Sequence, residues 1–350
     1  MRIAQIAPLY EPVPPRLYGG TERVVAHLAD ALVELGHDVT LFASGDTWTR
    51  ARLASMRERA LRLDPAALKS DIAAHLAMLK EVQNRVDEFD VLHFHIDLLH
   101  FPFFEAVAAR TLTTLHGRLD IDDLPWAYRR WPEYPLVSIS DSQRRPLAFA
   151  NWIATVPHGI PTERFHFSPK DAGYLAFVGR ISPEKRPDRA IEIARRTGMP
   201  LKIAAKVDPV DQHYFDLVVV PMLDPPFVEF LGEVDDVAKN ALLGGAAALL
   251  FPIDWPEPFG LVMIEAMACG TPVIAWDMGS VREVVEDGVS GFVVDSIDAA
   301  IAALGRVPTL DRRAIRTHFE KRFSAATMAR RYAELYARLE IAERPTLIRA

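Results

Sequence analysis

The chain has little cysteine, no long apolar run and no excess of basic residues. Its 350 residues include one cysteine, Cys269, which has no partner for an internal disulfide and fits a reducing compartment. No stretch approaches the roughly 18 apolar residues of a membrane span, and residues 1–8 are broken by proline too early for a signal peptide. With 47 acidic against 40 basic residues, the chain lacks the basic surplus typical of nucleic-acid binding. We therefore expect a cytoplasmic protein without a nucleic-acid partner.

The length and composition favour two soluble domains. Half of the residues are hydrophobic and 25% are charged, which is ordinary for a globular protein. A chain of 350 residues is too long for one ordinary core and is long enough for two.

Short apolar runs alternate with helical patterns in two successive cycles, which predicts an α/β fold with parallel sheets. Residues 161–173 carry prolines and no period, so the linker is expected there. The predicted domains are 1–165 and 170–324, and the long helical pattern at about 310–338 extends into the C-terminal end. The predicted strands are 2–7, 39–43, 91–95, 111–115, 136–139 and 154–156 in the first cycle, and 174–178, 201–205, 228–231, 247–251, 273–275 and 291–294 in the second. Helices are predicted at about 21–36, 65–86 and 187–197.

The stretch from Glu257 to Glu265 places two carboxylates on either side of a helix start. Gly260 allows a close backbone approach, and the helix that it opens presents free N–H groups. Such an end suits a phosphate or a ring of sugar hydroxyls. Glu257 and Glu265 accept hydrogen bonds, so both suit a polyhydroxylated ligand, Glu265 through hydroxyls such as those of a ribose. The alternative to a binding role is that both glutamates are solvated charges of a surface helix, but the neighbouring residues are too apolar for an open surface.

Two cations follow the first strand of the second cycle. Arg180 and Lys185 are expected at the carboxyl end of that strand, where open α/β sheets bind ligands, and Lys206 after the next strand could add a third charge. Arginine offers a fork for two phosphate oxygens and lysine a mobile point charge. Solvated loop charges are the alternative reading of the same residues.

Gly19 and Gly20 lie between the first predicted strand and its helix. The helix start supplies donors for a diphosphate, although paired glycines are often only a turn. The pattern differs from the G-x-G-x-x-G of dinucleotide-binding proteins, which disfavours a dehydrogenase.

Metal ligands are not predicted. His93 and His95 alternate on one strand face, with His100 and Asp97 nearby, but they do not form a specific set of four ligands. A structural or acceptor-side role is favoured for these histidines. Asp120 and Asp122 have D-x-D spacing without a preceding apolar strand, and are predicted to lie in a loop.

The stretch from Glu257 through Gly270 to Val273, together with Gly179, Arg180 and Lys185, resembles the retaining glycosyltransferases of family 4. The matching segments run from Gly19 to Gly291. The resemblance implies the GT-B fold, with two Rossmann-like domains facing across a cleft. It implies transfer of a hexose-type sugar from a nucleotide diphosphate sugar, UDP- more than GDP-, to an acceptor hydroxyl by a front-face, metal-independent mechanism that retains configuration. The C-terminal helix, about 325–350, is expected to pack back on the first domain.

The resemblance also assigns roles to residues. Its catalytic residues are His116, which contacts the donor sugar, with Arg180, Lys185 and Glu257. Its nucleotide-sugar-binding residues are Gly19, Gly20, Val234 beside the nucleobase, Phe259, Gly260, Leu261, Val262 and Glu265. No cofactor or metal is expected, because the nucleotide sugar is a co-substrate.

Two other functions remain open at this stage: a nucleotide-sugar epimerase on the same fold, and a non-catalytic nucleotide-sugar-binding protein. The acceptor is a small molecule, a glycan or a lipid-linked molecule. The arginines within residues 50–62 could form a local basic patch, but the first half has more acidic than basic residues, so charge does not support membrane association.

Overall fold

The structure is a computed structural model that describes residues 1–17 and 19–343. The chain forms two compact units. The N-terminal unit consists of Met1–Gly159 together with the last helix, α12 (Ala325–Glu343), and the C-terminal unit is Ile160–Ser324. Residues 344–350, the end of the predicted C-terminal helix, lie outside the described residues.

A parallel sheet forms the centre of the N-terminal unit, in the order β3-β2-β1-β4-β5-β6-β7. The central strands read as continuous apolar runs because helices cover both faces of such a sheet. Its strands are β1 (Arg2–Ile6), β2 (Asp38–Ala43), β3 (Arg52–Ser55), β4 (Val91–Phe94), β5 (Thr111–Thr114), β6 (Leu136–Ser138) and β7 (Trp152–Thr155). The helices are α1 (Gly20–Glu34), α2 (Asp71–Asn84), α3 (Phe101–Phe104), α4 (Leu124–Tyr128) and α12.

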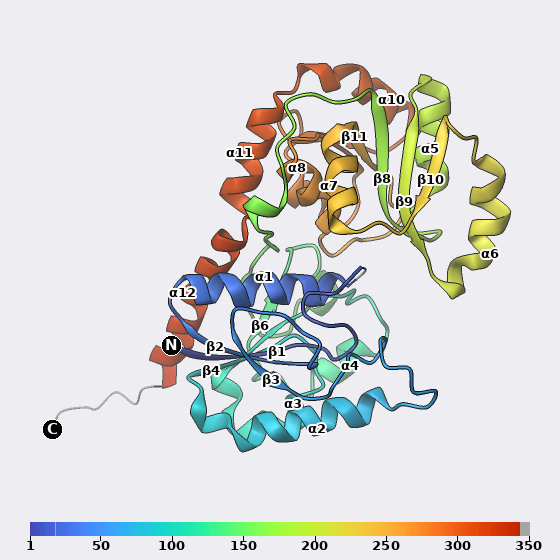
Figure 1. Ribbon diagram of the computed structural model, residues 1–350. Coiled ribbons are helices and arrows are strands. Elements are labelled where there is room, and N and C mark those ends of the chain that lie inside the picture. The colour runs from blue at the N-terminus through green and yellow to red at the C-terminus, as the bar shows by residue number, and fades with distance from the viewer. Residues whose placement is uncertain (18, 344–350) are drawn as a thin grey trace. The chain divides into compact units, whose positions relative to one another are not determined.

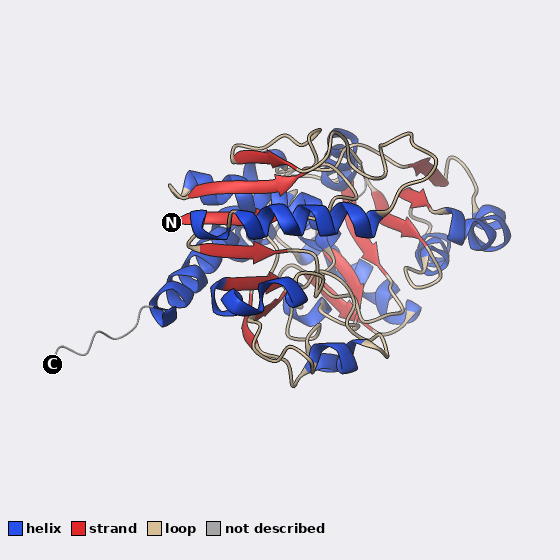
Figure 2. Cartoon of the chain, turned by 90° about the horizontal axis from the view of Figure 1, so that it is seen from below, coloured by secondary structure: helices blue, strands red, loops and turns tan. Residues whose placement is uncertain are grey.

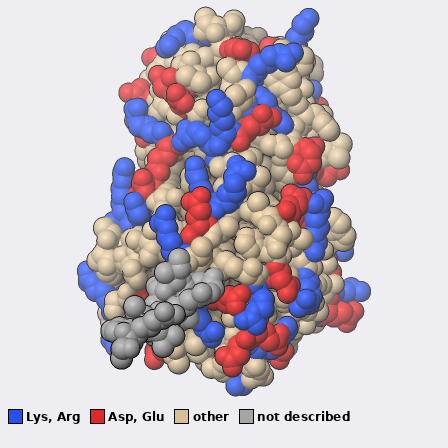
Figure 3. All heavy atoms as spheres, turned by 90° about the vertical axis from the view of Figure 1, so that its left-hand side faces the viewer, with Lys and Arg blue, Asp and Glu red and all other residues tan. Residues whose placement is uncertain are grey.

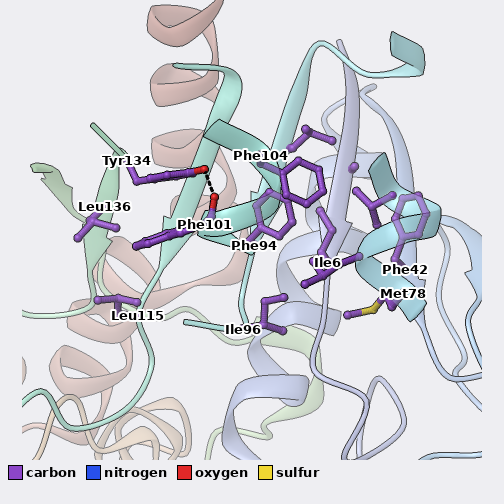
Figure 4. Close-up of a cluster of buried hydrophobic side chains, with 14 of the residues drawn as sticks. Ile6, Phe42, Met78, Phe94, Ile96, Phe101, Phe104, Leu115, Tyr134 and Leu136 are labelled. Carbon is purple, nitrogen blue, oxygen red and sulfur yellow. Dashed lines mark hydrogen bonds between the residues drawn. The ribbon is translucent and has the colours of Figure 1, made fainter. Parts of the chain in front are cut away.

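Aromatic and aliphatic side chains fill one side of this sheet (Figure 4). Phe94 on β4 stacks on His100 with ring centroids 3.7 Å apart, and Tyr134 stacks on Phe101 at 4.1 Å. The buried Tyr134 hydroxyl donates to the Phe101 carbonyl at 2.5 Å, which satisfies its polar atom within the apolar cluster (Figure 4). Helix α12 packs against α1 (Figure 1).

The C-terminal unit contains a second parallel sheet, in the order β10-β9-β8-β11-β12-β13. Figure 2 shows the strands in red and the helices in blue. The strands are β8 (Tyr174–Ile181), β9 (Leu201–Val207), β10 (Val228–Gly232), β11 (Ala246–Phe251), β12 (Val273–Trp276) and β13 (Gly291–Val294). The helices are α5 (Pro187–Thr197), α6 (Gln212–Tyr214), α7 (Asp236–Gly245), α8 (Leu261–Ala268), α9 (Val281–Val284), α10 (Ile297–Arg306) and α11 (Arg312–Phe323). The predicted α/β class with two parallel sheets is confirmed.

Three of the differences from the sequence-based expectation have a local cause in the structure. Strand β3 was not predicted, because this short edge strand carries exposed Arg52 and Ser55 at its ends. Helix α2 begins at Asp71 rather than near 65, since the Ser70 side chain accepts from the Ala73 N–H and caps it there. The C-terminal helical pattern divides at Ser324, whose extended backbone ends α11 before α12 begins.

Basic and acidic side chains are interspersed on the face drawn in Figure 3. This mixture agrees with the ion pairs along the chain, for example Arg316 Nε to Glu320 Oε1 at 2.6 Å. No helix within residues 1–17 and 19–343 combines the length and apolar character that crossing a membrane requires.

Candidate active site

In the C-terminal unit, the candidate site lies where β8 and β11 run side by side at the middle of the sheet. After β8 the chain continues to β9, toward one edge of the sheet, and after β11 it continues to β12, toward the other edge. Ligands of open α/β sheets bind outside the carboxyl ends of two such strands. The two loops that follow the strands are tied together. The Asp254 N–H donates to the Glu184 carbonyl at 2.8 Å, and Arg186 pairs with Asp254 at 3.0 Å.

The structure brings together two of the predicted catalytic side chains, Lys185 and Glu257. Lys185 Nζ forms an ion pair with Glu257 Oε2, and Trp255 Nε1 donates to the same oxygen at 3.1 Å. The ammonium also lies 4.9 Å from the Trp255 ring centroid. The side chains of Lys185 and Glu257 are 18% and 12% exposed, so solvent screens their pairing little. Glu257 Oε1 bonds to no described residue and can accept from a ligand hydroxyl.

Gly279 fixes the backbone of Glu257. The Ser280 N–H donates to the Glu257 carbonyl at 3.0 Å, and Gly279 has a φ of +58°. A Cβ at Gly279 would lie 2.4 Å from both the nitrogen and the carbonyl oxygen of Glu257. Only glycine fits this approach, and sequence reasoning did not identify it because the two segments are distant along the chain.

Arg180 lies at the end of β8 as predicted, and three carboxylates surround its guanidinium. Glu184 Oε1 lies 2.8 Å away, and Asp208 and Asp211 at 3.7 and 3.6 Å. Lys206, the β9 neighbour of Arg180 in register, pairs with Asp208 at 2.8 Å. Sequence reasoning missed these acids, although the aspartates directly follow β9 and could have been found from that position.

Gly260, Leu261 and Val262, where backbone donors were predicted, lie at the start of α8. Gly260 precedes this helix in the left-handed region, with a φ of +79°, and a Cβ there would lie 2.7 Å from the Met263 Cε. Leu261 and Val262 are partly exposed at the first turn. Phe259 is buried instead, with its ring edge-to-face against Phe323 at 6.1 Å, so its side chain is a core residue. The first N–H groups of a helix have no partner within it, so this end suits an anionic ligand.

Glu265 and Val234 occupy surroundings that the sequence did not indicate. Glu265 on α8 is 4% exposed, and its Oε1 pairs with Lys239 Nζ at 2.6 Å. Lys239 of α7 is thus a partner that sequence reasoning missed. Val234 packs, partly buried, against the apolar cluster of Ala204 and Leu242.

In the N-terminal unit, Gly19 and Gly20 begin α1. Gly19 is buried with a φ of +154°, and a Cβ there would lie 2.8 Å from the Pro15 Cβ. Its carbonyl accepts from the Arg23 N–H at 3.2 Å, which starts the helix at Gly20. The backbone of Gly20 is exposed at that helix end.

His116 follows β5 and belongs to a cluster of histidines. Its Nε2 lies 2.9 Å from His95 Nδ1, and its ring stacks on that of His158 with centroids 5.1 Å apart. Burial lowers the pKa of His116 to about 3, so its ring is neutral at pH 7. Burial also lowers the pKa of His93, His95 and His158 well below the ordinary value. We call His93, His95, His116 and His158 the histidine cluster.

The histidines near β4 have partners within the protein. His93 bonds Tyr336 and Thr114 at 2.7 and 2.8 Å, and His100 bonds Thr113 at 3.2 Å. Within residues 1–17 and 19–343, no group of three or more His, Cys, Asp or Glu side chains is placed to hold a metal ion.

Two family models match consecutive parts of the chain. "Glycosyltransferase Family 4" matches residues 18–164, and "Glycosyl transferases group 1" matches residues 161–307. The two matches follow one another along most of the sequence.

Named relatives and solved structures agree with these matches. The chain is 27% identical to a phosphatidyl-myo-inositol mannosyltransferase of Mycobacterium leprae, over 95% of this chain and 93% of that protein. The chain is 36% identical to a D-inositol 3-phosphate glycosyltransferase of Thermobispora bispora, over 48% of this chain and 44% of that protein. The crystal structure of AviGT4, a glycosyltransferase involved in avilamycin A biosynthesis, aligns with a TM-score of 0.74 and 26% identity, over 97% of this chain and 98% of that one. The resemblance predicted from the sequence is confirmed: the chain belongs to glycosyltransferase family 4 and is a glycosyltransferase with the GT-B fold.

Proposed function

We propose that the protein transfers a hexose-type sugar from a nucleotide diphosphate sugar, UDP- in preference to GDP-, to an acceptor hydroxyl with retention of configuration. The observation that carries this proposal is the Lys185–Glu257 pair at the carboxyl ends of β8 and β11, with Arg180 at the end of β8. This arrangement combines cations for a diphosphate with a carboxylate oxygen, Glu257 Oε1, that can accept from a sugar hydroxyl.

The proposed reaction is a front-face displacement. The bond between the anomeric carbon and the diphosphate oxygen breaks, and a bond to the acceptor oxygen forms on the same face. The acceptor's proton passes to the departing diphosphate oxygen, so no base from the protein is needed. Arg180, Lys185 and the N-terminal end of α8 at Gly260–Val262 stabilise the charge that develops on the diphosphate.

Glu257 and Glu265 have separate proposed tasks. Glu257 Oε1 accepts from a sugar hydroxyl while Oε2 keeps Lys185 in place. Glu265 accepts from the ribose hydroxyls through the oxygen that Lys239 does not bind. Val234 packs on the nucleobase, and the buried Phe259 acts by supporting the loop that precedes α8.

In the N-terminal unit, His116 Nδ1 is proposed to accept from a substrate hydroxyl. This nitrogen is buried and has no hydrogen-bond partner among the described residues. An unpaired buried acceptor is costly, so a ligand that donates to it is favoured. Gly19 and Gly20 are proposed to present the N-terminal end of α1 to a phosphate.

The acceptor and the metal requirement are also proposals. Two similar proteins have names with an inositol-containing acceptor, so inositol derivatives are the first acceptors to test. Since Arg180 and Lys185 can neutralise the leaving diphosphate, we propose that transfer needs no metal ion.

The test is a panel of UDP- and GDP-linked glucose, galactose and mannose, with and without inositol acceptors. Released nucleotide and the anomeric configuration of the product are measured, and EDTA is added in a parallel series. Lys185→Gln is expected to abolish release, whereas Lys202→Gln, at a half-exposed lysine of β9 in the same unit, leaves it unchanged. Release that survives Lys185→Gln, an inverted product or inhibition by EDTA would each overturn the corresponding part of the proposal.

A further inference from the structure

A buried chain of hydrogen bonds leads from His116 to the last helix within the N-terminal unit. His116 Nε2 lies 2.9 Å from His95 Nδ1, and His95 Nε2 lies 2.7 Å from Gln5 Oε1. The Gln5 amide nitrogen donates to the Tyr336 hydroxyl at 3.0 Å. Gln5 and Tyr336 are fully buried, and His95 nearly so. Three elements thus contribute: β1 carries Gln5, the end of β4 leads to His95, and α12 carries Tyr336.

The polarity of the Gln5 amide decides where each proton lies. Its oxygen can only accept, so His95 must carry its proton on Nε2. His95 is neutral because burial keeps its pKa far below 7, and its Nδ1 therefore accepts. His116 must then donate through Nε2–H, which leaves a lone pair on Nδ1.

A second arm holds Tyr336 in place. His93, beside Gln5 in the β1–β4 register, bonds the Tyr336 hydroxyl through Nδ1 at 2.7 Å and Thr114 through Nε2 at 2.8 Å. Since Tyr336 accepts from Gln5, its own proton points to His93. Thr114 also bonds the Tyr332 hydroxyl at 2.8 Å. With its proton directed to His93, the Tyr336 hydroxyl accepts from the Gln5 amide nitrogen, and this contact orients the Gln5 amide.

We propose that Gln5 and Tyr336 are positioning residues, which hold His116 in the Nε2–H tautomer so that Nδ1 faces a substrate hydroxyl as an acceptor. The proposal rests on the function proposed above, and it adds which residues set the tautomer of His116. The stacked ring of His158 restrains rotation of the same imidazole. The group that fixes the tautomer lies more than one hundred residues along the chain from the group that it serves.

The test reads the tautomer directly. Long-range ¹H–¹⁵N correlation spectra of the full chain at pH 7.5, assigned with a His116→Gln variant, distinguish a protonated Nε2 from a protonated Nδ1. The wild type is expected to show His116 only as Nε2–H. Tyr336→Phe and Gln5→Leu remove a link and are expected to give a mixture of tautomers, with kcat/KM lower by about ten-fold or more.

Two matched variants control for a loss of packing. Tyr332→Phe removes a hydroxyl from the same helix but leaves the Gln5 link intact, so the His116 signals stay unchanged. Gln5→Glu keeps an acceptor for His95 Nε2–H and is expected to retain the Nε2–H tautomer that Gln5→Leu loses.

The tautomer spectra test the proposal even when no substrate is known. A wild-type His116 protonated on Nδ1 overturns the proposal, as does a tautomer that survives Tyr336→Phe and Gln5→Leu in folded variants. Because the spectra are recorded without a sugar donor, a donor panel that shows no turnover counts against the proposed function and leaves the tautomer result standing by itself.

Discussion

Replacing Glu257 probes the centre of the candidate site most directly. In the wild type, Oε2 accepts from Lys185 and Trp255, and the proposed function assigns Oε1 to a sugar hydroxyl. In Glu257→Gln, the amide oxygen can keep both donors while an NH₂ group replaces Oε1. In Glu257→Ala, Lys185 loses its partner and the acceptor proposed for the sugar hydroxyl is removed.

The magnitudes follow from these contacts. A hydrogen bond to a charged group contributes about 1.5–3 kcal/mol, so Glu257→Ala should lower kcat/KM by about 10- to 150-fold from this contact alone. Displacement of Lys185 adds to this loss. Glu257→Gln exchanges a charged acceptor for a neutral group and should cost about 1 kcal/mol, or roughly five-fold. Because the pair is mostly buried, Glu257→Ala should lose about 3 kcal/mol of unfolding free energy, a shift of several degrees in Tm. Glu257→Gln keeps both donors and should lose only about 1 kcal/mol.

The assay compares kcat/KM and Tm for both variants with the donor found in the panel. Glu320→Gln is the control, since Glu320 also pairs with a basic side chain of the C-terminal unit but is 47% exposed, and its activity should match the wild type. A Glu257→Ala enzyme with kcat/KM within about two-fold of the wild type would refute the assignment of Glu257.

Three further predictions concern stability and donor binding. Burial lowers the pKa of each histidine in the histidine cluster, so below about pH 6.5 the unfolded chain binds protons that the native unit does not. The free energy of unfolding should therefore be highest above that pH and should fall below it by about 1.4 kcal/mol per histidine per pH unit. Thermal melts from pH 7.5 to 5 check this, and a flat profile contradicts it. Gly279→Ala should cost more than about 2 kcal/mol in urea unfolding and impair transfer, whereas Gly305→Ala, in an unobstructed turn of α10, should be neutral or stabilising. Asp211→Asn removes a carboxylate 3.6 Å from Arg180 and should tighten UDP binding by about three- to ten-fold in calorimetry; weaker binding would show that Asp211 orients Arg180 instead.

The sequence predicted the fold well because apolar runs and helical periods determine an α/β layer structure locally. The strands from β8 to β13 all appear near their expected positions. What it missed depends on contacts between distant segments or on weak local signals. Strand β3 pairs at the sheet edge with a polar sequence, and the break at Ser324 lies inside a pattern that reads as one helix.

The candidate site was predictable in its residue types and less so in its partners. Arg180 and Lys185 were singled out by their place at the end of a predicted strand and Glu257 by its place before a helix start, while their roles came from the family resemblance. The structure pairs Lys185 with Glu257. The carboxylates around Arg180 and the Lys239 partner of Glu265 come from elements that only folding brings together. The role of Gln5 is invisible in sequence because an isolated glutamine in an apolar strand carries no motif.

The ion pairs of Arg180 and Lys185 contribute to the stability of the C-terminal unit. A largely buried Lys185 left without a partner would cost several kcal/mol, and Glu257 offsets that cost. Under the proposed function, donor binding is an exchange of partners, in which a diphosphate competes with carboxylates for Arg180 and Lys185. Neutral sugars cannot compete for these cations, whereas a diphosphate presents several charged oxygens to both. If the proposed function holds, the same carboxylates that stabilise the folded site make donor binding depend on the charge of the leaving group.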